Sequence, residues 1–364
     1  MERRKFIVKA GGVLASAGAV GTLVSAPSVI AQPKVQWRMP SAYPAATDVL
    51  LGSAQRLAKA VDEMSGGRFR IEVTPAGQVV PPLGVFDAAS QGTVEAYHAV
   101  SFFWAAKEPA NYWFTTVPFG LNAQGIAAWY LHGDGLKLWE ETYAPHNLVP
   151  RPGISTGPQM AGWFRKKINT IADFKGLKMR IPGLGGQVIA KAGGTAVLIP
   201  GGEVYGSLER GVIDASEWSG PYDDLKLGLH NTARYYYYPG WHEPGATLEY
   251  GFNKKAYEAL PTDLRQILDH AAASTQVYGL TEYEAKNSIA LDKIKTELKG
   301  KAELLQLPAP VLRDLKKLAL EVTREASEKS PMAKKVYASF TKFQAQLAGW
   351  SRISEGAYHQ HVAL

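Results

Sequence analysis

Three side chains that could hold a small anionic solute beside a cation stand next to two short apolar segments. Glu217 and Trp218 directly follow residues 212–216, and Arg180 lies near the end of residues 177–181. Ligands of open α/β sheets bind beyond the carboxyl ends of the strands, so strands at these segments would place the three side chains at a pocket. A guanidinium clasps a carboxylate with two parallel hydrogen bonds. The Glu217 carboxylate and the Trp218 carbonyl are oxygen ligands, which hard cations such as Na⁺ and Ca²⁺ prefer.

Further candidates for this pocket come from two other segments. The amide oxygen of Gln159, at the start of an apolar segment, would suit the same hard cation. Phe102 and Phe103 follow the predicted strand at residues 94–100 and are expected to line the cleft from a first lobe. Together with Trp218 they would exclude water, which strengthens ion pairing in the closed cleft.

The same residues leave other interpretations open. Arg180 and Glu217 could instead pair with each other across neighbouring strands, as a structural contact. A lyase or hydrolase acting on a carboxylated substrate, with Glu217 or Glu243 as its base, is a further alternative. The sequence offers no plausible proton partner for that base, so a binding protein without enzymatic activity is favoured.

Signals of catalysis are sparse elsewhere in the chain. There is no His-Glu-x-x-His motif and no Walker loop, and the histidines are dispersed. The glycine-rich run at residues 183–186 lacks the third glycine of a dinucleotide-binding loop, because position 188 is valine, and a tight turn is the better interpretation. Asp223 and Asp224 form an acidic doublet at a helix end, where they are expected either to be solvated or to interact with the helix dipole.

Composition limits the class of protein. The 364 residues are 46% hydrophobic and 20% charged, which is enough for two lobes with a large core. No cysteine occurs, so thiol catalysis, disulfides and cysteine-ligated metals are excluded. The formal charge of +7 is spread among acidic residues without a basic stripe, which argues against nucleic-acid binding.

The N-terminal segment is predicted to be an export signal. A twin arginine at Arg3 and Arg4 precedes Phe6, an uncharged apolar stretch follows, and small residues end the segment near Ala31. The twin arginine resembles a Tat signal, although export by the Sec route stays open. Cleavage near Ala31 would release a periplasmic protein; an uncleaved membrane anchor is the alternative.

The chain beyond the signal alternates short apolar runs with amphipathic segments, as in βαβ units, so an α/β fold is predicted. Residues 32–150 and about 246–280 are assigned to a first lobe, and residues 151–245 to a second. Strands crossing between them would form a hinge, because no disordered linker separates the lobes. Helices at about 281–330 would span or pack on the lobes.

Two helical segments follow the lobes. Residues 261–298 are expected to be one long helical stretch, broken only at Gly279. Residues 331–364 are expected to form a C-terminal helix that either lies on its own lobe or serves as a homodimer arm. Its apolar seam repeats at intervals of four and three residues: Val336, Phe340, Phe343, Leu347 and Trp350.

Three motifs make the chain similar to the periplasmic solute-binding proteins of tripartite ATP-independent periplasmic (TRAP) transporters. These are GGRF at residues 66–69, KGLKMR at residues 175–180 and LERGVIDA at residues 208–215. The resemblance covers nearly the whole chain. It implies a two-lobed periplasmic binding protein fold, with hinge-crossing strands and a long helix that spans both lobes, and membrane subunits of a transporter as partners.

The resemblance also implies roles for single residues. Arg180 matches the arginine of the GLKMR run, which is the carboxylate clasp of the family. Many members carry an Asn-Pro pair after the LERGVIDA motif, whereas this chain has EWSGP at residues 217–221, like members that bind 2-oxo acids or lactate. In those members a cation bridges solute and protein, which implies Gln159, Glu217 and Trp218 as contacts and Glu243 as a weaker candidate.

The leading hypothesis is an exported binding protein that captures a small 2-oxo monocarboxylate, most of all one resembling pyruvate. Arg180 would bind the carboxylate, and Na⁺ would be held beside it. Lactate or another hydroxy acid with Ca²⁺ is the alternative that keeps the same fold.

Overall fold

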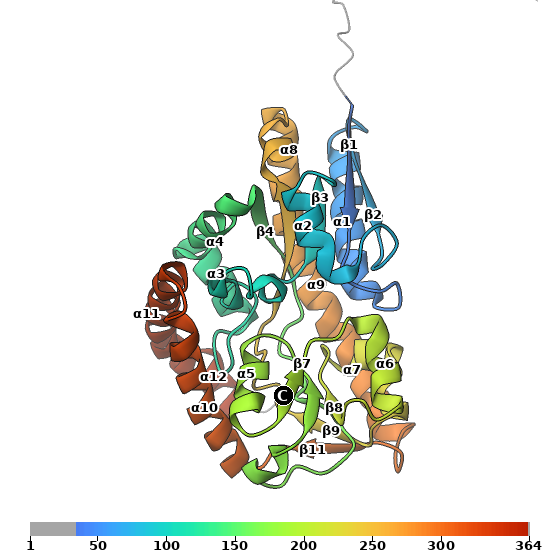
Figure 1. Ribbon diagram of the computed structural model, residues 1–364, viewed down its shortest axis with the longest axis vertical. Coiled ribbons are helices and arrows are strands. Elements are labelled where there is room, and N and C mark those ends of the chain that lie inside the picture. Colours follow the sequence, from blue (N-terminus) through green and yellow to red (C-terminus); the bar gives the residue numbers. More distant parts are fainter. Residues whose placement is uncertain (1–33, 363–364) are drawn as a thin grey trace, which may run out of the picture. The chain divides into compact units, whose positions relative to one another are not determined.

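The computed structural model describes residues 34–362 of the chain. These residues form two groups of strands, and helices cover each group (Figure 1). The export signal expected at residues 1–31, with its twin arginine and its cleavage site near Ala31, lies outside the described residues. Within residues 34–362, no helix combines the length and the apolar character that a bilayer crossing requires.

The first group of strands combines segments from distant parts of the chain. Its strands are β1 (Val35–Pro40), β2 (Phe69–Thr74), β3 (Ala96–Ala99), β4 (Leu148–Ser155) and β10 (Thr247–Asn253). β1 and β2 pair in parallel, and β10 lies between β3 and β4 with antiparallel pairing on both sides. A bridge between Ser41 and His98 joins the end of β1 to the β3 strand. β10 therefore belongs to the first group, in line with the assignment of residues from about 246 to a first lobe.

Helix α1 shows how the sequence determines the local structure of this group. The helices here are α1 (Asp48–Met64), α2 (Val85–Ser90), α3 (Ala123–His132), α4 (Gly135–Tyr143) and α8 (Lys254–Glu258). Leu50, Ala54, Leu57 and Val61 recur at helical spacing along α1, and all four are buried. Gly66 follows with a φ of 63°, a left-handed conformation that commonly ends helices.

The second group is a six-stranded sheet with the order β11-β9-β5-β8-β6-β7. Its strands are β5 (Gly162–Phe164), β6 (Lys178–Arg180), β7 (Thr195–Val197), β8 (Ala215–Ser216), β9 (Tyr235–Tyr238) and β11 (Glu303–Gln306). The helices α5 (Gly183–Lys191), α6 (Gly201–Glu209) and α7 (Pro221–Lys226) connect them. β6 and β8 are parallel neighbours, so the residues that follow their carboxyl ends leave the sheet at one edge.

The strand predicted at residues 212–216 is shorter in the structure. Val212 is 54% exposed, and the backbone N–H groups of Val212 and Ile213 donate to the carbonyl oxygen of Ser207, at 2.9 and 3.3 Å. These bonds close the last turn of α6, so the prediction is wrong for residues 212 and 213. The backbone N–H of Asp214 donates to the carbonyl oxygen of Lys178 in β6 at 2.7 Å, and β8 itself comprises Ala215 and Ser216.

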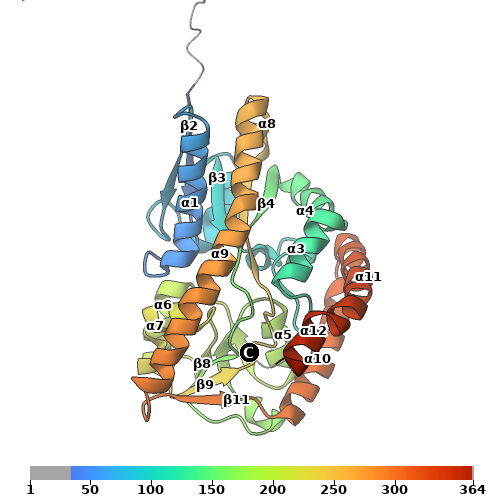
Figure 2. The ribbon, with the colours of Figure 1, turned by 180° about the vertical axis from the view of Figure 1, so that it is seen from behind.

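The long helix α9 (Thr262–Thr296) connects the two groups of strands. It packs against β4 and α1 in the first group and against α7 in the second, and Figure 2 shows it running along both. The chain also passes between the groups at residues 156–161 and 239–246. β4 runs through residue 151, where the sequence analysis placed the start of the second lobe.

The break expected at Gly279 is wrong, because α9 is continuous through this residue. A Cβ atom at position 279 would lie 2.3 Å from both Cβ and Cγ2 of Ile154 in β4. Glycine at this position therefore allows α9 to approach the sheet closely, and it does not interrupt the helix.

Replacing Gly279 by alanine is expected to lower the free energy of unfolding by about 1–3 kcal/mol, as overpacking of a core does. The matched control is Gly52→Ala in α1, where a Cβ atom would meet nothing within 4 Å. Alanine there should stabilise the protein by about 0.5–1 kcal/mol through helix propensity. Urea unfolding followed by circular dichroism measures both changes. Equal stabilisation by the two substitutions would contradict the close-approach explanation.

The C-terminal helices are α10 (Ala309–Ser327), α11 (Pro331–Ile353) and α12 (Glu355–His361). The predicted apolar seam of α11 is buried only in its first part. Val336 and Phe340 are buried in the core and Phe343 packs partly against it, whereas Trp350 is 65% exposed. The helix therefore lies on its own chain at its start and presents an uncovered apolar end within the described residues.

Candidate functional site

A small cavity lies where β6 and β8 end, and residues from both groups of strands line it. Its volume is about 40 Å³. The structure brings every candidate side chain to its wall: Phe102, Phe103, Gln159, Arg180, Glu217, Trp218 and Glu243.

Arg180 is 3% exposed and its guanidinium is fixed by several contacts. Nη1 donates to the carboxylate of Glu217 and, at 3.2 Å, to the backbone carbonyl of the same residue. Nε donates to the carbonyl oxygen of Ile199 at 3.3 Å, and the guanidinium carbon lies 4.8 Å from the centre of the Trp218 ring. No residue between positions 34 and 362 accepts a hydrogen bond from Nη2. That nitrogen is available to a ligand in the cavity.

The ion pair between Arg180 and Glu217, considered above as a structural alternative, is present in the structure. It does not use all the polar atoms of either side chain. Beyond the free Nη2 atom of Arg180, the Oε2 atom of Glu217 faces Nε2 of His242 at 3.4 Å. The ion pair between Arg180 and Glu217 is therefore compatible with a ligand site at the same residues.

A second carboxylate, that of Glu243, lies beside the first. Glu243 is 4% exposed, and burial together with the nearby Glu217 raises its pKa well above the ordinary value, against the opposing effects of Arg180 and Gln159. Nε2 of Gln159 donates to Glu243 at 2.8 Å and to the hydroxyl of Thr156 at 3.2 Å. The Oε1 atom of Gln159 is buried and has no hydrogen-bond partner among the described residues.

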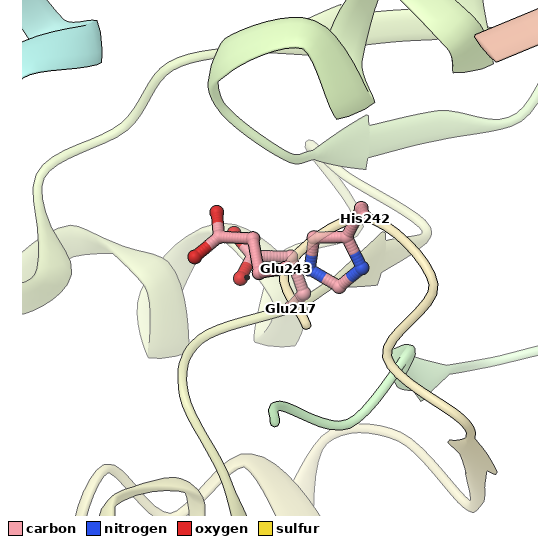
Figure 3. Close-up of side chains that lie close together, drawn as sticks. All are labelled: Glu217, His242 and Glu243. Atoms are coloured by element: carbon pink, nitrogen blue, oxygen red, sulfur yellow. Dashed lines mark hydrogen bonds and ion pairs between the residues drawn. The ribbon is translucent and has the colours of Figure 1, made fainter. Parts of the chain in front are cut away.

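These groups form a cluster that is rich in oxygen atoms. One ligand atom from each of Glu217, His242 and Glu243 lies within 4.8 Å of the others, and Figure 3 shows both carboxylates on the same side of the imidazole ring. Two carboxylates and an unpaired amide oxygen fit a hard cation such as Na⁺ or Ca²⁺, because such ions take oxygen ligands. A buried pair of carboxylates with a single arginine is also short of positive charge.

Aromatic rings form the apolar wall of the cavity. Phe102 and Trp218 are each 8% exposed, and Phe103 is half-buried. The ring of Tyr43 meets that of Trp218 edge to face, with 6.5 Å between the ring centres. The Phe102, Trp218 and Tyr43 rings belong to one hydrophobic cluster that also holds residues of β4, β5 and β10, so the core of the protein positions them.

The close packing of α5 determines where His242 lies. Gly183 has a φ of 64°, which agrees with the tight turn expected for the run at residues 183–186. A Cβ atom at Gly185 would lie 2.9 Å from the Cβ of His242. Glycine at position 185 therefore lets the loop that carries His242 and Glu243 approach the helix.

Tyr43 and Thr156 are among the lining residues that were not selected from the sequence. Tyr43 follows the end of β1 and Thr156 the end of β4, so the strand-end rule that selected Arg180 could have found Tyr43. Asp223 and Asp224 lie in the first turn of α7, as expected for a helix end, but the expectation that they are solvated is wrong, since both are fully buried.

The environment of the two aspartates explains their burial. Asp223 accepts hydrogen bonds from Ser219 and Tyr283, at 3.0 and 2.6 Å, and Asp224 accepts from Trp163 and Tyr236, at 3.1 and 2.8 Å. Burial raises the pKa of Asp223 to about 6 and that of Asp224 to about 7. The sequence pattern at the start of α7 did not indicate that hydrogen-bond donors from other elements would surround the two aspartates.

Residues 153–157 match the Gly-x-Ser-x-Gly pattern of a hydrolase nucleophile elbow, but no elbow forms here. Ser155 is the last residue of β4 and pairs with Thr247 of β10, and its hydroxyl accepts from the N–H of Gly157 at 3.2 Å. Among the described residues no histidine bonds to this hydroxyl, so the serine lacks the base that a nucleophile requires.

The chain matches a known family along most of its length. The model of the bacterial extracellular solute-binding proteins, family 7 (DctP), matches residues 41–330. A monocarboxylate 2-oxoacid-binding periplasmic protein of Nostoc sp. is 42% identical over 331 residues, covering 91% of this chain and 90% of that protein.

Solved structures of TRAP transporter solute-binding proteins are similar as well. One from Bordetella bronchiseptica is 40% identical with a TM-score of 0.88, and the match covers 90% of this chain and 97% of that one. It is a mixed-occupancy dimer with calcium and picolinate in one active site and an apo second site. Another, from Pseudoalteromonas atlantica with bound sodium and pyruvate, is 37% identical with a TM-score of 0.87, covering 90% of this chain and 99% of that one.

Proposed function

Because this chain belongs to family 7 of the bacterial extracellular solute-binding proteins, we propose that it captures a small 2-oxo monocarboxylate of the pyruvate type together with a cation. One observation carries the proposal: the cavity places the free edge of the Arg180 guanidinium beside two buried carboxylates and the unpaired amide oxygen of Gln159. A solute carboxylate satisfies the arginine, and a cation satisfies the oxygen atoms.

The class of protein follows from the family itself. The chain is the periplasmic solute-binding component of a TRAP transporter, and it is a receptor and not an enzyme, as are its relatives. The fold prediction of two lobes is confirmed by the same structural neighbours. Membrane subunits of the transporter are therefore partners, and the protein acts outside the cytoplasm. A twin-arginine signal cleaved near Ala31 is the route that we propose for its export.

We assign a role to each residue of the cavity. Arg180 binds the solute carboxylate, and the cation joins the keto oxygen to the carboxylates of Glu217 and Glu243. Gln159 contributes its amide oxygen, and Trp218 contributes its backbone carbonyl to the cation and its ring to the apolar wall. Phe102 and Phe103 complete that wall and keep water from the ion pairs.

The supporting relatives differ in their cation, since one holds sodium with pyruvate and another calcium with picolinate. For this chain we propose Na⁺, with Ca²⁺ as the alternative ion and lactate as the alternative solute. The oxygen ligands described here suit either ion.

Native mass spectrometry of the protein purified from the periplasm without refolding tests the function directly. We expect a bound mass equal to one 2-oxo monocarboxylate plus one Na⁺ or Ca²⁺, and the increment separates pyruvate from lactate and sodium from calcium. A protein that retains no organic acid, and shows no heat of binding with pyruvate in either salt, would refute the proposal.

The same spectrum reports the oligomeric state, for which we propose a homodimer through the C-terminal helix. The uncovered end of α11 and the following helix supply exposed apolar side chains: Trp350 (65% exposed), Ile353 (71%), Tyr358 (50%) and Val362 (47%). A dimer mass is expected for the parent and a monomer mass for the Trp350→Asp, Ile353→Asp double variant. A monomeric parent would end the dimer proposal and leave the binding proposal intact.

A further inference from the structure

A second cavity shares part of its wall with the ligand cavity. The residues common to both are Phe102, Phe103 and Pro182. The ligand cavity holds about 40 Å³ and its neighbour about 370 Å³. Phe102, Phe103 and Pro182 therefore form a partition between a small cavity and a much larger one.

The small cavity suits only a short acid. With about 40 Å³, the ligand cavity offers about one ninth of the space of its neighbour, at about 370 Å³. Pyruvate, with three carbons and its carboxylate at Arg180, makes less demand on that space than its longer homologues. An acid with a longer alkyl chain would have to displace one of the surrounding side chains.

The larger cavity offers apolar surroundings that such a chain would need. Apart from the partition, its lining includes small and aliphatic side chains on α5, β7 and the segment after Trp104: Ala105, Ala106, Ile181, Ala190, Val197 and Leu198. Within the part of the chain that the structure describes, no charged side chain belongs to its lining. An alkyl group that reached this space would be transferred from water to an apolar environment, which is favourable.

The two rings of the partition are not equally fixed. Phe102 is 8% exposed and lies against Gly183, where a Cβ atom would already be 3.3 Å from its ring. Phe103 is only half-buried, and its ring meets that of Phe102 edge to face with 5.2 Å between centres. Trp104 behind it is held by a 2.7 Å hydrogen bond from its indole nitrogen to Glu249. Phe103 is thus the member of the partition that truncation can remove with the least disturbance.

We propose that Phe103, supported by Phe102, is the chain-length filter of this receptor. This inference rests on the proposed function, because it concerns the same bound 2-oxo acid. The ring closes the cavity behind the methyl group of pyruvate and excludes longer 2-oxo acids from the apolar space beyond it. A hydrophobic site discriminates by roughly 10- to 200-fold for each methylene group that it rejects.

Calorimetric titration with pyruvate, 2-oxobutanoate, 2-oxopentanoate and 2-oxohexanoate tests the filter in the parent protein and in Phe103→Ala. The readout is the ratio of the affinities for 2-oxopentanoate and pyruvate. The parent is expected to prefer pyruvate by at least about 10-fold, and Phe103→Ala is expected to raise the ratio by about 10-fold or more. Phe103→Leu, a milder truncation, should raise the ratio for 2-oxobutanoate first and serves if the alanine variant fails to fold.

The matched control is Tyr112→Ala. Tyr112 is also half-buried and lines the larger cavity, but it takes no part in the lining of the ligand cavity. Truncation of Tyr112 enlarges the larger cavity and leaves the Phe102 and Phe103 rings in place. The ratio of the affinities for 2-oxopentanoate and pyruvate should therefore stay unchanged.

Several outcomes separate the filter from the proposed function. Unchanged ratios in both Phe103 variants, with pyruvate still bound, would overturn the filter and leave the function standing. A parent that binds 2-oxopentanoate as tightly as pyruvate would do the same. If neither parent nor variant binds any of the four acids, the proposed function fails and the filter fails with it.

Discussion

Calorimetric titration of the Arg180→Ala variant with pyruvate is expected to give a dissociation constant roughly 30-fold to several thousand-fold above that of the parent. This range corresponds to a loss of about 2–5 kcal/mol, typical when one partner of a buried, hydrogen-bonded charge pair is truncated. The effect should be this large because, among residues 34–362, Arg180 is the only arginine or lysine that lines the cavity. A solute carboxylate would then be desolvated without any cationic side chain to receive it.

The geometry around Arg180 explains why the side chain can act with little rearrangement. Glu217 and Ile199 hold Nη1 and Nε, and the Trp218 ring lies against the guanidinium, so the orientation of the free Nη2 atom is already set. Preorganisation of this kind reduces the entropy lost on binding. The conservative variant Arg180→Lys keeps a charge but loses the planar fork, and it should bind pyruvate with an affinity between those of the parent and the alanine variant.

A matched control separates binding from folding. Arg151 is another poorly exposed arginine, with ion pairs to Glu140 and Asp269, but it lies outside the cavity lining. Arg151→Ala should lower the thermal unfolding temperature while the affinity for pyruvate stays within twofold of the parent. If Arg180→Ala unfolds normally and still binds pyruvate as the parent does, Arg180 serves only as the partner of Glu217.

Local sequence patterns predicted most of the helices and strands. These elements depend on the spacing of residues within one short segment, and the sequence shows that spacing directly. The spacing of Leu50, Ala54, Leu57 and Val61 in α1 follows directly from the helical repeat. The return of β10 to the first group of strands was expected from its position in the chain and was confirmed by its pairing with β3 and β4. The strand-end rule placed Arg180 and Glu217 at one edge of the sheet, and β6 and β8 are indeed parallel neighbours.

Two of the errors concern contacts between distant segments. Gly279 looks like a helix breaker in the sequence, and only its approach to Ile154 in another element reveals why glycine is needed. Asp223 and Asp224 look like solvated acids until Tyr283, Trp163 and Tyr236 arrive from other elements to donate hydrogen bonds. Tertiary packing decided each of these cases, and no window of neighbouring residues contains that information.

In the candidate site, too, local patterns identified some residues, whereas contacts between distant segments determined the position of others. Arg180 and Glu217 were selected from their own strands, whereas the involvement of Glu243 rested only on resemblance. The hydrogen bond from Gln159 to Glu243 spans 84 positions in the sequence, so the cluster exists only after the loop at residues 240–243 has folded against residue 159. Backbone bonds from Gly240 to Gln159 and from Gln159 to Glu243, at 2.9 and 3.1 Å, fix that arrangement.

Substitution of Glu217 by glutamine is expected to remove the dependence of pyruvate binding on the cation. In the parent, pyruvate should bind tightly with Na⁺ or Ca²⁺ present and weakly after chelation in a sodium-free buffer. In Glu217→Gln the affinity with the cation present should fall on the order of 100-fold, because cation affinity changes by orders of magnitude with the number of charged ligands. Calorimetry in matched buffers with choline, Na⁺ and Ca²⁺ measures the difference.

Glu249→Gln is the matched control for this experiment, because Glu249 is also a fully buried glutamate and lies outside the cavity lining. Tyr97, Tyr143 and Trp104 donate to its carboxylate, and burial raises the pKa of Glu249 to about 7. Its replacement should lower stability and leave the response to Na⁺ and Ca²⁺ unchanged. If Glu217→Gln retains the cation response of the parent, the carboxylate at position 217 holds Arg180 in place and does not bind the ion, and the cation site would have to be sought at Glu243 and Gln159 without it.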